Sequence, residues 1–213
     1  SKVRSGRDDI THYLPRTKDN LTKLLVAIGS DVRVIIIKLA DRLHNLRTLE
    51  YQSREKQLKK ARESLEVFGP LADRLNMGRV RVEIEDLSFK YLAPKRYEKL
   101  RKAIDDRLAQ SQQTIEQVRD EVEHRLIAEH IPASINGRIK SVYSLHKKLT
   151  KHANMDDIYD IMALRIITDD ISSCYLILGI LHQMYVPMPG RIKDYIARPK
   201  RNGYQSLHTT VTT

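Results

Sequence analysis

The apolar residues in the first 130 positions recur every third or fourth residue, which is the spacing of one face of an α-helix. Ser30 is expected to cap a helix that begins at Asp31. A second helix should run from about Ser53 to Phe68, because Gly69-Pro70 favours a helix end at that point. The apolar stripe of the first helix consists of Leu39, Leu43, Leu46 and Leu49.

Further helices are expected before residue 130. Residues 70–78 and 80–92 suggest another helical pair, ended by Pro94. Residues 95–129 are strongly charged, yet their apolar positions keep the helical spacing, so we expect one or two long, exposed helices that link two domains. These apolar positions are Leu100, Ile104, Leu108, Ile115, Val118, Val122 and Leu126.

After His130 the pattern changes to short apolar runs that alternate with helical stretches. Runs rich in β-branched residues favour strands. Alternating strands and helices predict a small α/β or α+β domain, with a boundary near residue 130. The expected order is a strand within 131–139, a helix over 141–151, a strand over 162–168, a helix over 171–185, a turn-rich segment over 187–195 and a final strand near 207–213.

Composition and charge narrow the class of partner. The 213 residues are 41% hydrophobic and 31% charged, as in ordinary globular proteins. The net charge of +11 favours an anionic partner, such as nucleic acid, an acidic membrane face or a phosphorylated small molecule. No apolar run is long enough to span a membrane, and the N-terminus has no apolar region typical of a secretion signal. The single Cys174 fits a reducing cytosol, so we expect a cytoplasmic protein.

The segment Gly190–Thr210 combines cations with rings. Lys and Arg neutralise phosphate oxygens, and a tyrosine ring offers a face on which a base can stack. Asn202-Gly203 predicts a tight turn whose backbone amides can approach a ligand. A solvated basic hairpin would explain the charges alone, but their combination with this turn, a tyrosine and a histidine favours a nucleotide-binding site. The side chains concerned are Arg191, Lys193, Arg198, Lys200, Arg201, Tyr195, Tyr204 and His208.

A second basic cluster lies within His130–Met155, where the sequence has no acidic residue. If residues 139–150 are helical, Lys140, Ser144 and Lys148 lie at i, i+4 and i+8 on one face. An ordinary solvated face explains this helix taken alone. Two basic clusters in one small domain favour a site for a polyphosphate.

Polyphosphate chemistry usually needs a divalent cation, which prefers carboxylate ligands. Asp160 precedes an expected strand and is our candidate Mg²⁺ ligand. In the first half, Lys38, Asp41 and Asn45 lie at i, i+3 and i+7, opposite the leucine stripe. Taken by itself this row is best explained as a solvated polar face, because one aspartate cannot hold a metal ion.

Four motifs in order resemble the catalytic half of the RelA/SpoT family, the long bacterial enzymes that make and destroy the alarmones (p)ppGpp. The resemblance covers nearly the whole chain from Asp31 onward. The Arg-Ile-Lys-Asp run at 191–194 resembles the form found in bifunctional members. The motifs are VIIIKLADRLHNLRTL at 34–49, GRIKSVYSLHKKL at 137–149, DIYDIMALRII at 157–167 and GRIKDYIARPKRNGYQSLHTTV at 190–211.

The resemblance implies a multi-domain α and α+β fold. Residues 1–92 would form the C-terminal part of an all-helical HD-type hydrolase domain. Residues 93–130 would form a helical linker region. Residues 131–213 would form the N-terminal part of a small, mixed-sheet, nucleotidyltransferase-like synthetase domain.

The resemblance also implies a reaction, the transfer of pyrophosphate from ATP to the 3′-hydroxyl of GDP or GTP with Mg²⁺. Positioning and charge neutralisation do most of the work in such transfers. Matched by motif, Arg138 would stack on adenine, Lys140, Ser144 and Lys148 would contact the ATP phosphates, and Asp160 would hold Mg²⁺. Lys193 and Lys200 would contact phosphates, and Asn202, Tyr204 and His208 would form the acceptor pocket, with Tyr204 stacking on guanine.

In the hydrolase domain the resemblance makes Asp41 the last Mn²⁺ ligand and Asn45 a contact of the (p)ppGpp nucleotide. Two departures from the family pattern stand out: residues 1–40 contain no His-Asp pair, and the family's Glu-x-Gln-x-Arg strand is not reached by Thr213. We therefore expect residues 1–213 alone neither to hydrolyse alarmone nor to synthesise it efficiently. The alternatives are a basic module that binds RNA or the ribosome, and a catalytically silent, nucleotide-binding regulatory domain.

Overall fold

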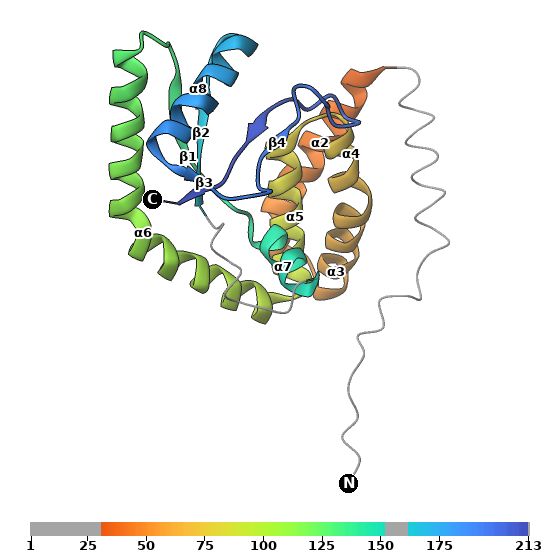
Figure 1. The fold of residues 1–213 in the computed structure, drawn as a ribbon. Helices are drawn as coiled ribbons and strands as arrows, with labels where there is room; N and C mark the ends of the chain where they lie inside the picture. Colours follow the sequence, from red (N-terminus) through yellow and green to blue (C-terminus); the bar gives the residue numbers. More distant parts are fainter. Residues whose placement is uncertain (1–30, 152–161, 213) are drawn as a thin grey trace. The chain divides into compact units, whose positions relative to one another are not determined.

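The computed structural model describes residues 31–151 and 162–212, which form two compact units (Figure 1). The first unit contains the described residues up to Ala72 together with Met77–Leu92. The second contains Asp73–Asn76 and the described residues from Ala93 onward. Within these ranges no helix is long and apolar enough to cross a membrane.

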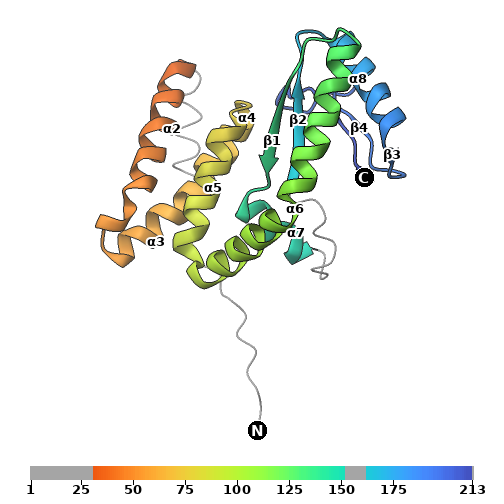
Figure 2. The ribbon, with the colours of Figure 1, turned by 90° about the vertical axis from the view of Figure 1, so that its left-hand side faces the viewer.

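The chain from residue 32 to residue 92 is helical, as predicted. In the first unit α5 packs against α2 and α3, and Figure 2 shows the three helices side by side. The predicted leucine stripe is buried at Leu39, Leu46 and Leu49, and Leu43 is half-buried. The elements are α2 (Val32–Arg47), a 3-10 turn (Leu49–Tyr51), α3 (Arg54–Glu63), a π turn (Ser64–Phe68), α4 (Gly69–Arg74) and α5 (Gly78–Leu92).

The start of α2 differs from the prediction by one residue. The helix begins at Val32, and Asp31 is its N-cap. The Asp31 carboxylate accepts the backbone N–H of Arg33 at 2.9 Å, which satisfies a donor that the first helical turn leaves without a partner. Ser30 lies outside the described residues. The sequence offers two good capping residues in succession, and the local pattern did not distinguish them.

The prediction that Gly69-Pro70 ends a helix is wrong. Helical backbone continues from α3 through the π turn into α4 and ends only at Arg74. In the π turn the Gly69 N–H donates to the Ser64 carbonyl, five residues earlier. We attribute the continuation to this turn, because one extra residue per turn makes room for a ring that a regular α-turn excludes.

The main part of the second unit starts with α6 (Pro94–Ala128), a single helix of 35 residues with Pro94 in its first turn. Its apolar positions face two groups of partners. Near its start it contacts α7 (Val142–Lys151). Near its end, Val122 and Leu126 belong to a core that also contains Ile177 and Ile180 of α8 (Ile171–Met184). The helical prediction for residues 95–129 is therefore confirmed.

Three two-stranded antiparallel ladders complete the described part of the second unit. The predicted sequence of strand, helix, strand and helix after residue 130 is confirmed. The prediction of one final strand is corrected: residues 207–212 form two short strands that pair with different partners. The ladders are β1 (Ser134–Ile139) with β2 (Met162–Ile167), β3 (Val186–Pro187) with β6 (Val211–Thr212), and β4 (Lys193–Asp194) with β5 (Leu207–His208).

Candidate nucleotide-binding site

The hairpin formed by β4 and β5 carries most of the residues predicted in the segment Gly190–Thr210. Lys193 pairs directly with His208 across the ladder. At the tip of the hairpin Gly203 has a φ of +75°, which glycine adopts without steric cost, and its N–H donates to the Lys200 carbonyl at 2.8 Å. The Asn202 side-chain oxygen accepts the Tyr204 N–H at 3.2 Å. The predicted tight turn is confirmed.

Three rings of this hairpin gather into an aromatic cluster, which we define as Tyr195, Tyr204 and His208. Their centroids lie 5.2 to 6.1 Å apart, in edge-on orientations. The Tyr204 hydroxyl lies 2.9 Å from Nε2 of His208, within hydrogen-bond distance. The Lys200 ammonium lies 4.7 Å from the Tyr195 centroid and 4.8 Å from the Tyr204 centroid, which is cation–π distance.

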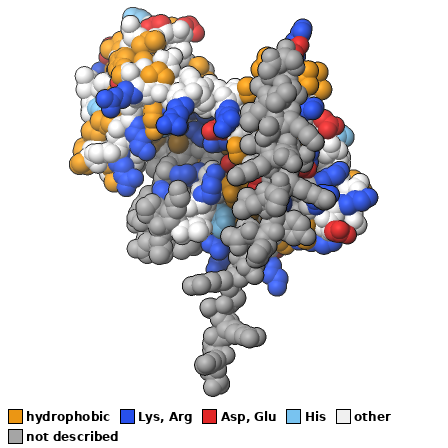
Figure 3. Space-filling view, turned by 90° about the vertical axis from the view of Figure 1, so that its right-hand side faces the viewer, with side chains coloured by type: hydrophobic (Ala, Val, Ile, Leu, Met, Phe, Trp, Pro, Cys, Tyr) orange, Lys and Arg blue, Asp and Glu red, His pale blue; other side chains and the backbone are white. Residues whose placement is uncertain are grey.

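The aromatic cluster is surrounded by positive charge. Basic side chains are more widespread than acidic ones on the face of the molecule drawn in Figure 3, in keeping with the net charge of +11. The pKa of His208 is lowered, first by burial and then by the charges of Lys200, Arg138, Lys193 and Arg165. A lowered pKa keeps the imidazole neutral near pH 7, so that it can share a hydrogen bond with the Tyr204 hydroxyl.

The two arginines come from one face of the β1–β2 ladder. Arg138 lies opposite Ala163, and Asn136 lies opposite Arg165, so the two arginines are diagonal neighbours. Both are exposed. The other face of the ladder carries Ile135 and Ile166, which pack on the hydrophobic core. One face of this short sheet therefore anchors it, and the other presents two guanidinium groups.

Arg165 was not among the predicted site residues. The signal was present, because Leu164 and Ile166 flank Arg165 and strand alternation places an arginine between them on the open face. What the sequence did not reveal is that this face carries Arg138 as well. That juxtaposition depends on the register of two strands separated by more than twenty residues.

The predicted row of Lys140, Ser144 and Lys148 is only partly correct. Helix α7 begins at Val142, so Lys140 precedes it and does not share a helical face with the other two residues. The cause is Ser141, whose hydroxyl accepts the Ser144 backbone N–H at 3.1 Å and so caps the helix. The same hydroxyl donates to the Ser144 hydroxyl at 2.7 Å, which fixes the orientation of that side chain.

The proposed metal ligands fall in two different situations. Asp160 lies outside the described residues. Asp41 is exposed on α2, and its carboxylate accepts a hydrogen bond from the Asn45 side-chain amide at 3.0 Å. In the parts of the chain that the structure describes, no group of three or more His, Cys, Asp or Glu side chains could hold a metal ion. A single carboxylate does not make a metal site.

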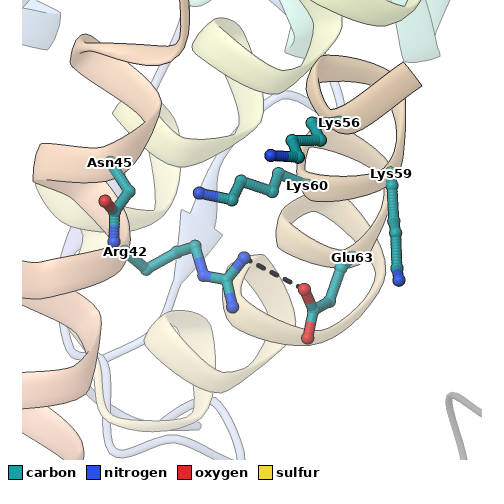
Figure 4. Close-up of a pocket in the computed structure, with 6 residues that line it drawn as sticks. All are labelled: Arg42, Asn45, Lys56, Lys59, Lys60 and Glu63. Atoms are coloured by element: carbon teal, nitrogen blue, oxygen red, sulfur yellow. Dashed lines mark hydrogen bonds and ion pairs between the residues drawn. The ribbon is translucent and has the colours of Figure 1, made fainter. Parts of the chain in front are cut away.

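Asn45 also lines a pocket of about 430 Å³ in the first unit. Arg42 is held there by Glu63, at 3.0 Å, and by the Phe68 ring, 4.1 Å from the guanidinium carbon. Figure 4 shows Lys56 and Lys60 extending from α3 toward the α2 side of this pocket. We call it the helical pocket. Its lining residues are Arg42, Asn45, Lys56, Lys59, Lys60 and Glu63.

Comparison with known proteins adds two family matches. Residues 137–213 match a region found in RelA/SpoT proteins, and residues 9–78 match an HD domain. The first match covers the hairpin, the β1–β2 ladder from Gly137 and α7. The second covers α2, α3 and α4, and therefore the helical pocket.

Three relatives show similar levels of identity but carry different names. A GTP pyrophosphokinase of Streptomyces coelicolor is 46% identical over 91% of this chain and 23% of its own length. A guanosine-3′,5′-bis(diphosphate) 3′-pyrophosphohydrolase of Spiroplasma citri is 47% identical over 90% of this chain and 26% of its own. A bifunctional (p)ppGpp synthase/hydrolase of Mycobacterium tuberculosis is 45% identical over 91% of this chain and 26% of its own. The chain thus spans about a quarter of the length of the curated relatives it matches.

Proposed function

Because this chain belongs to the RelA/SpoT family, we propose that the protein makes and destroys the alarmones (p)ppGpp. The observation that carries the proposal is the aromatic cluster ringed by four cations. Rings suit a base and cations suit phosphates, and a nucleotide supplies both. The reaction proposed for the second unit is transfer of pyrophosphate from ATP to the 3′-hydroxyl of GDP or GTP.

The acceptor nucleotide is assigned to the hairpin. Tyr204 would stack on guanine, and His208 and Asn202 would offer polar contacts to its edge or to the ribose. For the ring face of Tyr204 to receive a base, the Lys200 ammonium must leave it, and the phosphates of the nucleotide are a suitable new partner for that charge. Lys193, beside His208 in the ladder, is placed to contact the same phosphates.

The donor nucleotide is assigned to the open face of the β1–β2 ladder and to α7. A planar guanidinium stacks on a purine, and the two arginines of this face, Arg138 and Arg165, would hold adenine between or beside them. Ser144 and Lys148 on α7, with Lys140 just before it, would contact the ATP phosphates. Catalysis would then rest on holding the two nucleotides in position and on neutralising their charge.

Divalent metal ions are part of the proposal. Mg²⁺ would neutralise the transferred group when bound, with Asp160 as its proposed ligand. Mn²⁺ is proposed for the hydrolase, with Asp41 as one ligand. Since no three His, Cys, Asp or Glu side chains gather in the described part of the chain, the described residues do not by themselves fit a complete Mn²⁺ site. The hydrolase role therefore rests on the HD-domain match and on the helical pocket, whose cations suit the phosphates of (p)ppGpp.

The proposed partners are ATP, GDP or GTP, and (p)ppGpp, in the cytoplasm. A basic RNA-binding module is the competing function, favoured by the net charge of +11. It predicts RNA binding that weakens strongly with salt and shows no preference for guanine nucleotides.

Substitution of Tyr204 by Ala separates the two functions. Base–aromatic stacking is worth about 1–3 kcal/mol, so Tyr204→Ala should weaken GDP binding roughly tenfold or more and leave RNA binding unchanged. Calorimetric titration with GDP and with a single-stranded RNA measures both. The matched control is Tyr51→Ala, which removes a tyrosine that is 82% exposed in the first unit. Equal GDP affinity in native and Tyr204→Ala protein would refute the acceptor assignment.

A further inference from the structure

The turn that follows β4 is held by a single carboxylate. One oxygen of Asp194, Oδ1, accepts the backbone N–H groups of Ile196 at 2.9 Å and Ala197 at 2.8 Å. The residue enclosed by this turn is Tyr195, whose own N–H donates to the Ser206 carbonyl at 2.9 Å. The backbone around Tyr195 is therefore fixed on both sides, and this is the residue whose ring lies 5.2 Å from His208.

The other oxygen of Asp194 is bound from a different element. The Tyr175 hydroxyl donates to Oδ2 at 2.9 Å, and Tyr175 lies on α8. Two residues further along that helix, Ile177 is buried in the core, as is Ile180. The Tyr175 side chain thus connects a helix anchored in the core to the turn that carries Tyr195. The bonds from Ala197, Tyr175 and Ile196 lower the pKa of Asp194, so the carboxylate stays charged and accepts strongly.

We propose that Tyr175 is a positioning residue for the acceptor nucleotide: through Asp194 it holds Tyr195 against His208 and Tyr204. The inference rests on the proposed function of the aromatic cluster. Without the Tyr175 hydroxyl, Oδ2 of Asp194 loses a protein donor and the turn loses its link to α8. The rings then spend less time in one arrangement. A nucleotide must order them when it binds, and this free-energy cost weakens its binding.

The effect should be selective for the acceptor. Tyr195 contacts His208 and Tyr204, the residues assigned to guanine, and lies outside the β1–β2 face assigned to ATP. Removal of the Tyr175 hydroxyl should therefore weaken GDP binding and leave ATP binding unchanged. A purely structural role would instead lower the stability of the unit with no difference between the two nucleotides.

The chain offers a matched control at the end of the same helix. The Tyr185 hydroxyl donates to Oε2 of Glu121 on α6 at 2.7 Å, so it too is a tyrosine bound to a carboxylate. Both tyrosines have a raised pKa: at Tyr175 the bond to Asp194 is the largest cause, and at Tyr185 burial comes first, followed by the bond to Glu121. Tyr185 packs beside the hydrophobic core. Tyr185→Phe therefore removes the same chemical group without touching the turn at Asp194.

The experiment compares native chain, Tyr175→Phe and Tyr185→Phe by calorimetric titration with GDP and with ATP, and by the amide NMR signals of Ile196 and Ala197. Loss of one charge-assisted hydrogen bond that acts through the turn should weaken GDP binding roughly three- to tenfold in Tyr175→Phe. The two amide signals should shift in that variant alone. In an Asp194→Asn background the further effect of Tyr175→Phe should shrink, because the two groups act as one unit.

The proposal is overturned if Tyr175→Phe keeps native GDP affinity and native amide signals, or if Tyr185→Phe loses GDP affinity to the same extent. It is also overturned if ATP and GDP binding fall together. Failure of the acceptor assignment looks different, because GDP affinity would then be the same in native and Tyr204→Ala protein. In that case the link is still judged by the Ile196 and Ala197 signals, whose insensitivity to Tyr175→Phe would refute it.

Discussion

Around His208 the cations come from three different strands and from the loop between β4 and β5, whereas in the helical pocket three of the four cations come from α3. Lys56, Lys59 and Lys60 lie on one helix, and long side chains of a single helix can spread into water. Around His208, strand registers fix the backbone positions of three of the four cations, so these side chains start close together. Their mutual repulsion is a cost that an anionic ligand removes.

The two regions also differ in what accompanies the charge. The aromatic cluster places three rings among its cations, and the helical pocket has one ring, Phe68, already covered by Arg42. No ion pair joins Lys56, Lys59 or Lys60 to a carboxylate in the described part of the chain. Both regions suit phosphate. Lys200, which lies over the Tyr195 and Tyr204 rings, can move to the phosphates of a nucleotide, whereas Arg42 is held over Phe68 by its ion pair with Glu63. The two sites are therefore distinguished by the convergence of their cations and by their aromatic rings, and not by the number of cations.

The largest effect expected from this comparison concerns the open face of the β1–β2 ladder. If Arg138 and Arg165 both contact the donor base, either Arg→Ala change should weaken ATP binding roughly five- to thirtyfold, because a desolvated cation–π or stacking contact is worth about 1–2 kcal/mol. Arg119→Ala is the matched control, since Arg119 is a half-exposed arginine on α6 paired with Asp120. Calorimetric titration with ATP measures all three.

If only Arg138→Ala weakens ATP binding, the result contradicts a shared role of the two arginines on this face. Arg165 would then be an exposed arginine like Arg119, and the charge around His208 would come from fewer elements than the geometry indicates. GDP titration of the same variants adds a second measure. Both Arg→Ala changes should alter GDP affinity less than ATP affinity, because the arginines lie on the β1–β2 ladder and not on the hairpin.

Local signals in the sequence were sufficient for most elements. The leucine spacing of α2 and the apolar spacing within the strongly charged α6 were recognisable, because helical packing repeats every three or four residues. The errors arose where two local preferences competed. Ser141 caps α7, which leaves Lys140 outside the helix. The π turn allows the helical backbone to continue past Gly69-Pro70.

The site was predictable in its composition but not in its arrangement. Lys200, Tyr204 and His208 lie in one segment, and their type alone indicated a nucleotide. The position of Arg165 beside Arg138 and the bond from Tyr175 to Asp194 depend on strand register and on helix packing. These contacts join residues 19 positions apart in the second case, so no local pattern records them.

The helical pocket should respond more weakly to loss of one charge. Lys60→Ala should weaken binding of guanosine 3′,5′-bis(diphosphate) about threefold, because a partly exposed charge contributes only about 0.2–1 kcal/mol. The measurement is made in a Tyr204→Ala background, in which the acceptor site of the second unit is already weakened. Lys90→Ala is the control, because Lys90 is an exposed lysine of α5 in the same unit that does not line the pocket. Equal losses in the two variants would indicate a general effect of charge and no defined pocket.

The smallest effect expected is a change in the titration of His208, and it tests the convergence of cations directly. Burial and four cations lower the pKa of His208, so its neutral form is favoured in the folded protein. This contribution to stability is present above the ordinary histidine pKa of about 6.5 and is lost as the pH falls through the lowered folded value. Lys200→Met removes the cation with the largest effect on this pKa. The pKa of His208, followed by NMR, should rise part of the way toward the ordinary histidine value.

Burial remains in this variant, so a return to the full ordinary value would mean that Lys200→Met had opened the aromatic cluster. An unchanged pKa would mean that Lys200 stands too far from the imidazole in solution to act on it. Addition of GDP to the native chain should also raise the pKa of His208, because the phosphates bring negative charge to the same cations.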